Sequence, residues 1–143
     1  MSQYYLSPKC VSYLNMFPSH DRVGTPVFSP IRGVVSVRKH RGGYGNHIKI
    51  RDTFGREVVL AHLSKVLVKS GDEVFELDKI GLSGNTGFST GPHLHYGVRN
   101  LIIGRSKDPF DWKVKDYNNG YYGYYDVLPY TFNWKGTALN HNL

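Results

Sequence analysis

The chain has 143 residues, which is enough for one domain with a self-sufficient hydrophobic core. Its single cysteine, Cys10, excludes an internal disulfide, so the fold depends on packing, backbone pairing and any bound metal. The formal net charge of +7 favours a polyanionic partner, such as nucleic acid, an anionic cell-wall polymer or a membrane surface.

The first 22 residues predict an irregular N-terminal segment. They lack the basic and then apolar layout of a secretory signal. No apolar run in the chain approaches the roughly 18 residues that a membrane-spanning helix needs. We therefore expect no membrane span and, if this is the whole chain, no export by ordinary secretion.

Short β-branched runs, punctuated by glycine and proline, predict an all-β fold, since no long stretch shows the 3.6-residue apolar period of a helix. The turn sequences between these runs favour antiparallel sheets joined by hairpins. The segment 63–69 has room for one helical turn at most. In chain order, the predicted strands are 26–28, 33–38, 47–51, 57–62, 73–75, 80–83 and 93–99.

The tail from Asp116 onward is crowded with tyrosine and glycine and poor in aliphatic residues. One interpretation is an extension that lays its rings over the domain or pairs with a neighbouring chain. The other is a surface that binds sugars or a partner, because aromatic rings stack on apolar ligand faces. The predicted organisation is an irregular segment 1–22, a β domain 23–115 and a tyrosine-rich extension 116–143.

Two histidines in the last predicted strand stand one residue apart in the sequence GPHLHYG. Residues i and i+2 of a strand point to the same face, so His93 and His95 should present adjacent imidazoles while Leu94 faces the core. His62 closes the apolar strand VVLAH, where it too could line that face. Three imidazoles on one sheet surface are a plausible zinc site, because zinc binds imidazoles and carboxylates.

The other basic features are less specific. His40, His47 and His141 are each typical of a surface or hydrogen-bonded core histidine, and the basic run 38–41 is typical of a solvated loop tip. A basic nucleic-acid-binding barrel is a weaker idea, because the chain has no helix-turn-helix, aromatic ribonucleoprotein strand or paired-cysteine finger. We therefore expect no specific nucleic-acid partner.

The segment from Ala61 to Arg99, AHLSKVLVKSGDEVFELDKIGLSGNTGFSTGPHLHYGVR, resembles the core of the lysostaphin-like zinc metallopeptidases. GTPVFSPIRGVV and GGYGNHIKI before it, and DPFDW after it, follow that family's running order, so the likeness spans about residues 23–112. The resemblance implies a small antiparallel β sandwich of the duplicated hybrid motif type with a groove. It also implies cleavage of peptide cross-links in peptidoglycan.

The resemblance assigns roles to the three histidines. His95 matches a zinc ligand, while His62 and His93 match the pair that orients the attacking water and steadies the oxyanion. Zinc lowers the pKa of its bound water to about 7 and polarises the scissile carbonyl, and a neighbouring imidazole handles the proton. The resemblance also implies that the small residues of 84–87 and 89–91 shape the substrate groove with their backbone.

The chain departs from the family in one motif. The family takes its other two zinc ligands from a His-x-x-x-Asp sequence, but here the expected positions hold Leu14 and Pro18. Asp21 and His20 lie close by and are the candidate replacements, with Cys10 more remote. Adjacent residues of a regular strand face opposite ways, so Asp21 and His20 could both ligate only from an irregular loop.

Two functions follow from these residues. In the first, zinc is held by His95 with Asp21, His20 or both, and the protein is a metalloendopeptidase that cuts peptidoglycan peptides. In the second, the metal site is lost and the domain is a degenerate, inactive relative that binds the cell wall or serves as a structural tail module. Keeping three histidines favours the first, and losing the two-ligand motif favours the second.

Peptidoglycan lies outside the membrane that this N-terminus is not expected to cross. One resolution is a bacteriophage, with the protein acting as a virion tail component, which we prefer, or as a lysis enzyme. The other is a longer protein from which the secretion signal has been removed. The expected location is therefore the virion or the bacterial cell wall and extracellular space. The expected partners are the peptidoglycan peptide, anionic wall polymers attracted by the basic charge, and other virion tail proteins.

Overall fold

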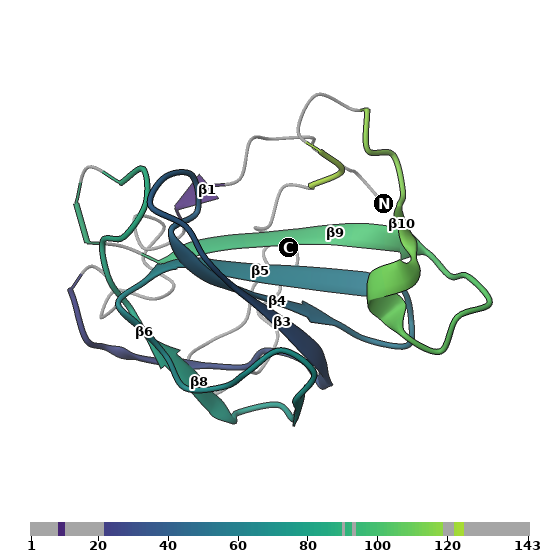
Figure 1. The fold of residues 1–143 in the computed structure, drawn as a ribbon, viewed down its shortest axis with the longest axis horizontal. Helices are drawn as coiled ribbons and strands as arrows, with labels where there is room; N and C mark the ends of the chain where they lie inside the picture. The colour runs from purple at the N-terminus through teal and green to yellow at the C-terminus, as the bar shows by residue number, and fades with distance from the viewer. Residues whose placement is uncertain (1–8, 11–21, 90, 93, 119–121, 125–143) are drawn as a thin grey trace, which may run out of the picture.

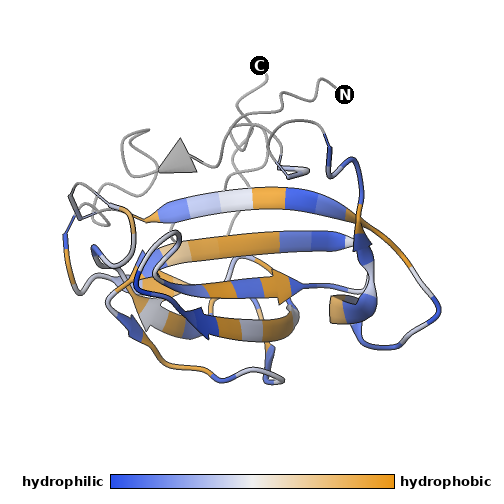
Figure 2. Cartoon of the chain, turned by 45° about the horizontal axis from the view of Figure 1, so that its top comes forward, coloured by the Kyte–Doolittle hydropathy of each residue, from blue (hydrophilic) through white to orange (hydrophobic). Residues whose placement is uncertain are grey.

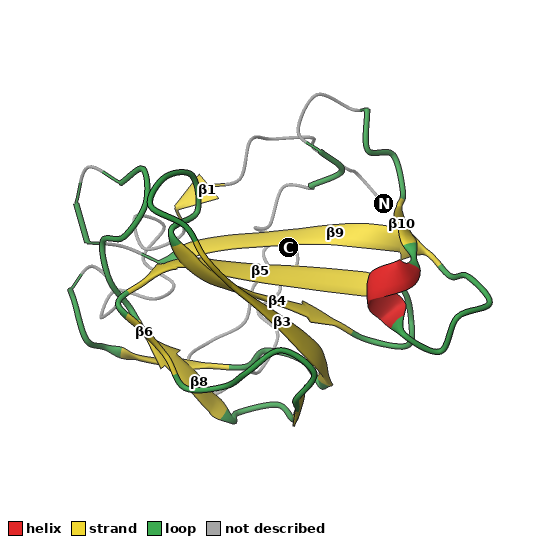
Figure 3. Ribbon diagram, in the orientation of Figure 1, coloured by secondary structure: helices red, strands yellow, loops and turns green. Residues whose placement is uncertain are grey.

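The computed structural model describes residues 9–10, 22–89, 91–92, 94–118 and 122–124. Among these residues, almost all regular structure is β-strand, and one short 3₁₀ turn, Pro109–Asp111, is the exception (Figure 3). The strands are β1 (Lys9–Cys10), β2 (Pro26–Phe28), β3 (Gly33–Lys39), β4 (Asn46–Arg51), β5 (Arg56–Leu63), β6 (Lys65–Val66), β7 (Glu73–Val74), β8 (Lys79–Leu82), β9 (His95–Ile102) and β10 (Lys113–Val114).

The strands form two antiparallel sheets. The larger has seven strands in the order β1-β9-β5-β4-β3-β7, with β10 also paired to β9, and the smaller has the order β2-β8-β6 (Figure 1). The prediction of an all-β protein built from antiparallel sheets is therefore confirmed. Among the described residues, no helix is long and apolar enough to cross a membrane.

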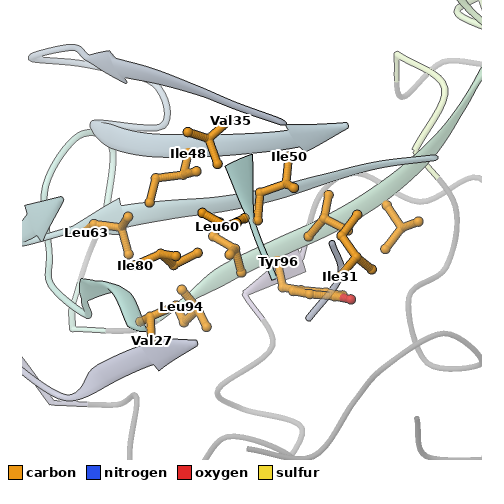
Figure 4. Packing of buried hydrophobic residues seen from close by; sticks show 13 residues of the cluster. Val27, Ile31, Val35, Ile48, Ile50, Leu60, Leu63, Ile80, Leu94 and Tyr96 are labelled. Atoms are coloured by element: carbon orange, nitrogen blue, oxygen red, sulfur yellow. The ribbon is translucent and has the colours of Figure 1, made fainter. Parts of the chain in front are cut away.

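The main core lies between the two sheets. Ile48 and Leu60 of the larger sheet and Val27 and Ile80 of the smaller one are at most 2% exposed and belong to one apolar cluster (Figure 4). Leu94 joins the same cluster, as the sequence predicted. Because β-strand side chains alternate between faces, the residues between these core positions are on the opposite face of the larger sheet. Figure 2 shows hydrophilic and hydrophobic residues following one another along its strands.

That opposite face carries a buried row of charges across three strands. Arg51, Glu57 and Arg99 are direct neighbours in the strand register. Arg51 Nε donates to one Glu57 carboxylate oxygen at 2.6 Å and Arg99 Nε donates to the other at 2.7 Å. Arg51 also donates to the carbonyls of Pro109 and Trp112, so the row fastens the 3₁₀ turn to the sheet.

Tyr124, from the C-terminal segment, lies on this face as well. Tyr124 is buried against Val59 and Ala61 and forms an isolated β-bridge with Arg99. Within the described residues, the extension therefore lays a tyrosine ring over the domain, as the first interpretation of the tail proposed. The division at 22 and 115 stays a prediction.

Some element bounds differ from the sequence prediction. The segment 63–69 contains the short strand β6 instead of a helical turn, because Lys65 and Val66 pair with the edge of β8. The last long strand runs from His95 to Ile102, so it begins and ends later than the predicted 93–99.

Candidate active site

A cavity of about 620 Å³ opens on the charged face of the larger sheet. Two imidazoles line it, those of His62 and His95, and so do the cationic side chains of Lys49 and Arg99. Aromatic rings form much of the remaining wall, including three from the C-terminal segment: Tyr117, Tyr122 and Tyr124. The cavity thus joins residues that are far apart in the sequence.

His62 and His95 face each other in this cavity. Their ring centroids are 5.5 Å apart with the ring planes at 75°, and both residues are about 95% buried. His95 is in register with Ala61, the residue before His62, across the β5–β9 pair. The structure therefore brings together these two of the predicted site residues.

An irregularity of β5 places His62 on this face. Leu60 points into the main core, so regular alternation would send His62 into the core too. His62 instead has φ of +61°, in the left-handed region that non-glycine residues seldom adopt. The register between β4 and β5 also shifts next to it, between Asn46 and Ile48, as in a β-bulge. The bulge turns the imidazole toward His95.

The glycine-rich turn at 84–87 fixes the His62 ring. Its Nδ1–H donates to the carbonyl oxygen of Thr86 at 2.6 Å, which leaves Nε2 as the nitrogen that can take a proton. The Thr86 hydroxyl in turn donates to the carbonyl of Leu63 at 2.7 Å. Gly87 has φ of +76°, and a Cβ there would collide with the backbone nitrogen of Gly45. The turn therefore positions the imidazole through closely packed backbone.

Tyr44 packs against the second imidazole. Its ring centroid is 4.9 Å from that of His95 and 5.3 Å from that of His47. Burial raises the pKa of the Tyr44 phenol, and the Tyr44 ring packs against the cluster that contains Tyr124. Tyr44 thus stays neutral and links the histidines to the tyrosines of the C-terminal segment.

The cations of the cavity were not among the predicted site residues. Burial lowers the pKa of Lys49, and the Glu57 carboxylate opposes that shift. Although burial opposes the charge of Arg99 too, Glu57 holds the pKa of Arg99 above its usual value. The alternation of the strand HIKIR was the signal available in the sequence, because it places Lys49 on the face opposite the core isoleucines. Sequence alone does not show that β4 and β9 expose these residues to one cavity.

Only some of the residues expected to bind zinc are among those that the structure describes. His95 fits by its chemistry, because zinc accepts imidazole nitrogen. Within the described ranges, no group of three or more histidine, cysteine, aspartate or glutamate side chains could hold a metal. His93, Asp21 and His20 lie outside the described residues. Their predicted roles, and those of His62 and His95, stay predictions.

Comparison with known proteins identifies the family of this chain. Residues 19–111 match the model of Peptidase family M23. The peptidoglycan DD-endopeptidase ShyA of Vibrio cholerae is 46% identical over 83 residues, which cover 58% of this chain and 19% of ShyA. The chain spans about a fifth of the length of the curated relatives that it matches.

Two solved structures are also similar. The catalytic domain of lysostaphin from Staphylococcus simulans has a TM-score of 0.54 and 32% identity, over 68% of this chain and 70% of that one. A variant of the catalytic domain of the prophage-encoded M23 protein EnpA from Enterococcus faecalis has a TM-score of 0.53 and 31% identity, over 62% and 69%. The resemblance drawn from the histidine motifs is therefore confirmed, and the chain belongs to peptidase family M23.

Proposed function

We propose that this chain is a metal-dependent endopeptidase that cleaves peptide cross-links of bacterial peptidoglycan. The observation that carries the proposal is the pair of buried imidazoles, His62 and His95, facing each other at 5.5 Å in a cavity. Its support from relatives is the similarity to a peptidoglycan DD-endopeptidase and to lysostaphin.

The chain's own residues divide the work between them. His95 would hold zinc, with Asp21, His20 or both completing the shell. When bound, zinc supplies a water of lowered pKa and polarises the scissile carbonyl. His62, whose Nδ1–H is held by Thr86, takes a proton at Nε2 and returns it to the leaving amine. His93 would join His62 in orienting the water and steadying the oxyanion.

A degenerate wall-binding or structural module is the second candidate. It is favoured by the absence of the His-x-x-x-Asp motif from the sequence. Such a module would keep the groove and the basic charge but lose the chemistry.

The proposed setting is a bacteriophage, with the protein in the virion tail or among the lysis proteins and acting on the cell wall from outside. A prophage-encoded M23 protein is among the similar solved structures. The net charge of +7 would hold the domain near anionic wall polymers, so binding to walls should weaken as salt rises. Detection of the protein in purified virions tests the tail assignment, and its presence only in late lysates would defeat that assignment.

The decisive experiment measures metal content and cleavage on one preparation. The wild-type chain should carry about one zinc, release peptides from purified peptidoglycan, and lose that activity in a chelator. His62→Ala should keep the zinc and lose cleavage, whereas His95→Ala should lose both. His40→Ala is the matched control, because His40 is exposed and lies outside the cavity lined by His62 and His95. Metal-free, inactive protein that still binds cell walls would establish the module instead.

A further inference from the structure

The cavity continues past the imidazoles to a cationic end that the proposed chemistry leaves unused. On β9, His95, Gly97 and Arg99 alternate along the face that lines the cavity. Lys49 is in register with Val59, and Val59 with Gly97, so these three share one row across the sheet. This row is two residues from His95, or about 7 Å along the strand.

The cationic end of the cavity carries more positive than negative charge. Each oxygen of the buried Glu57 carboxylate already accepts from one arginine, Arg51 or Arg99. None of the salt bridges formed among the described residues includes Lys49. Lys49 is half-buried and lines the cavity, so it adds a positive charge to a cluster that is already positive. An anion entering the cavity would compensate that charge where solvent screens it poorly.

Tyrosines wall this end of the cavity. A Cβ on Gly97 would be 3.0 Å from the Tyr124 ring, so that ring lies directly over the glycine. Arg99 donates to the carbonyl of Tyr122 at 3.0 Å, which ties the segment to the sheet beside the charges. The Tyr117 and Tyr122 rings lie 5.5 Å apart and line the same cavity. The wall limits how far a peptide can extend along β9 from the imidazoles.

We propose that the Lys49 end of the cavity is a subsite for a substrate carboxylate that lies within about two residues of the scissile bond. This inference rests on the proposed peptidase function. The ligand class is a peptide with a free carboxylate, which the Lys49 ammonium binds while the tyrosine rings pack on the adjoining backbone. An extended peptide advances about 3.3 Å per residue, so two residues cover the distance from the His95 row to the Lys49 row.

Two kinds of carboxylate satisfy this chemistry. One is the terminal α-carboxylate of a short stem, and the other is the side-chain carboxylate of an internal residue. The tyrosine wall favours the terminal α-carboxylate, because a peptide that ends at the wall does not have to continue past it. Synthetic cross-linked peptides distinguish them when each carboxylate is replaced separately by its carboxamide.

The experiment measures kcat/KM for these peptides with the full chain and with Lys49→Gln. The wild-type enzyme should prefer the free carboxylate over its carboxamide by about 10- to 100-fold, the range of a hydrogen bond to a charged group. Lys49→Gln should lose that preference and keep its activity on the carboxamide peptide, while Lys49→Arg restores it. Lys79→Gln removes an equal charge from the smaller sheet and should preserve the preference.

Each remaining outcome has a definite meaning. Equal cleavage of both peptides by the wild-type enzyme, or an equal loss on both in Lys49→Gln, overturns the subsite. If the wild-type chain cleaves nothing, the proposed peptidase function fails, and calorimetric binding of the same peptides tests the subsite by itself. In that case, wild-type binding that prefers the carboxylate and loses this preference in Lys49→Gln supports the subsite, and equal binding overturns it.

Discussion

His62 reaches the cavity beside His95 only because its backbone leaves the regular strand geometry. Its φ of +61° turns the imidazole away from the core side, where Leu60 lies two residues earlier. A non-glycine residue in the left-handed region costs about 1–3 kcal/mol, which the surrounding structure must offset. The bond from His62 Nδ1–H to Thr86 and the pairing of β5 with β9 hold it there.

Substitutions at His62 should separate backbone strain from chemistry. His62→Asn should keep the fold, because asparagine tolerates the left-handed region, but lower cleavage by about 100- to 10,000-fold through loss of a general base. His62→Val should in addition lose about 1–2 kcal/mol of unfolding free energy. Urea denaturation and peptidoglycan digestion measure the two effects. Substantial cleavage by His62→Asn would remove His62 from the proposed mechanism.

Glu57 should be among the most sensitive positions for stability. It is fully buried between Arg51 and Arg99, so Glu57→Gln leaves two buried guanidinium groups without their counter-charge. Breaking such a network costs about 3–5 kcal/mol, which urea denaturation would detect. Glu73→Gln is the control, since its pair with Arg32 is exposed at the surface and should contribute less than about 1 kcal/mol. Equal effects of the two substitutions would contradict this account of the charged row.

Gly97 should tolerate no side chain while Tyr124 stays in place. An added Cβ would be 2.9 Å from Val59 and 3.0 Å from the Tyr124 ring, so Gly97→Ala must displace the ring or strain the strand. We expect a loss of about 1–3 kcal/mol in unfolding free energy and increased quenching of tyrosine fluorescence by acrylamide. Gly91→Ala meets no atom within 4 Å and is the stability control. Unchanged stability and quenching in Gly97→Ala would show that Tyr124 does not pack there.

His47 should make the fold sensitive to mild acid. Burial lowers the pKa of His47 below its ordinary value of 6.5, although the bond from its Nδ1–H to the Gly45 carbonyl opposes the shift. As pH falls below 6.5, His47 is protonated more readily in the unfolded chain than in the folded one. The free energy of unfolding therefore decreases. The contribution is at most about 1.4 kcal/mol per pH unit.

The comparison that isolates this effect is wild type against His47→Gln. Urea denaturation at pH 7.5, 6.5 and 5.5 should give a flatter pH dependence in the variant. Other titrating groups contribute equally to both proteins and cancel in the difference. Parallel curves would mean that His47 does not control acid sensitivity.

Most strands of the fold were predictable, because short β-branched runs between glycine-rich turns favour strands over helices. The strand 26–28 has the predicted bounds, and 33–38 and 47–51 differ by one residue at an end. β6 was missed because two residues carry no periodic signal, and only pairing with β8 makes them a strand. Short edge strands depend on tertiary context more than on their own sequence.

The site was predictable only in part. His95 follows from strand alternation, but His62 does not, because alternation from Leu60 would bury it in the core. The end of the strand VVLAH suggested that His62 could line the same face, the family resemblance added its role, and the β-bulge explains how the side chain reaches that face. Lys49 and Tyr124 were missed because their shared cavity depends on the register of β4, β5 and β9, which sequence spacing does not reveal.

The packing of Tyr124 over Gly97 means that a residue beyond the family match covers part of the sheet inside that match. The family match ends at residue 111, yet Tyr122 accepts a hydrogen bond from the buried Arg99, and Tyr117, Tyr122 and Tyr124 form one side of the cavity. A chain trimmed to that match would expose Arg99 and Glu57 to water and open the cavity along β9. Domain swaps between relatives should therefore carry this segment with the sheet it seals.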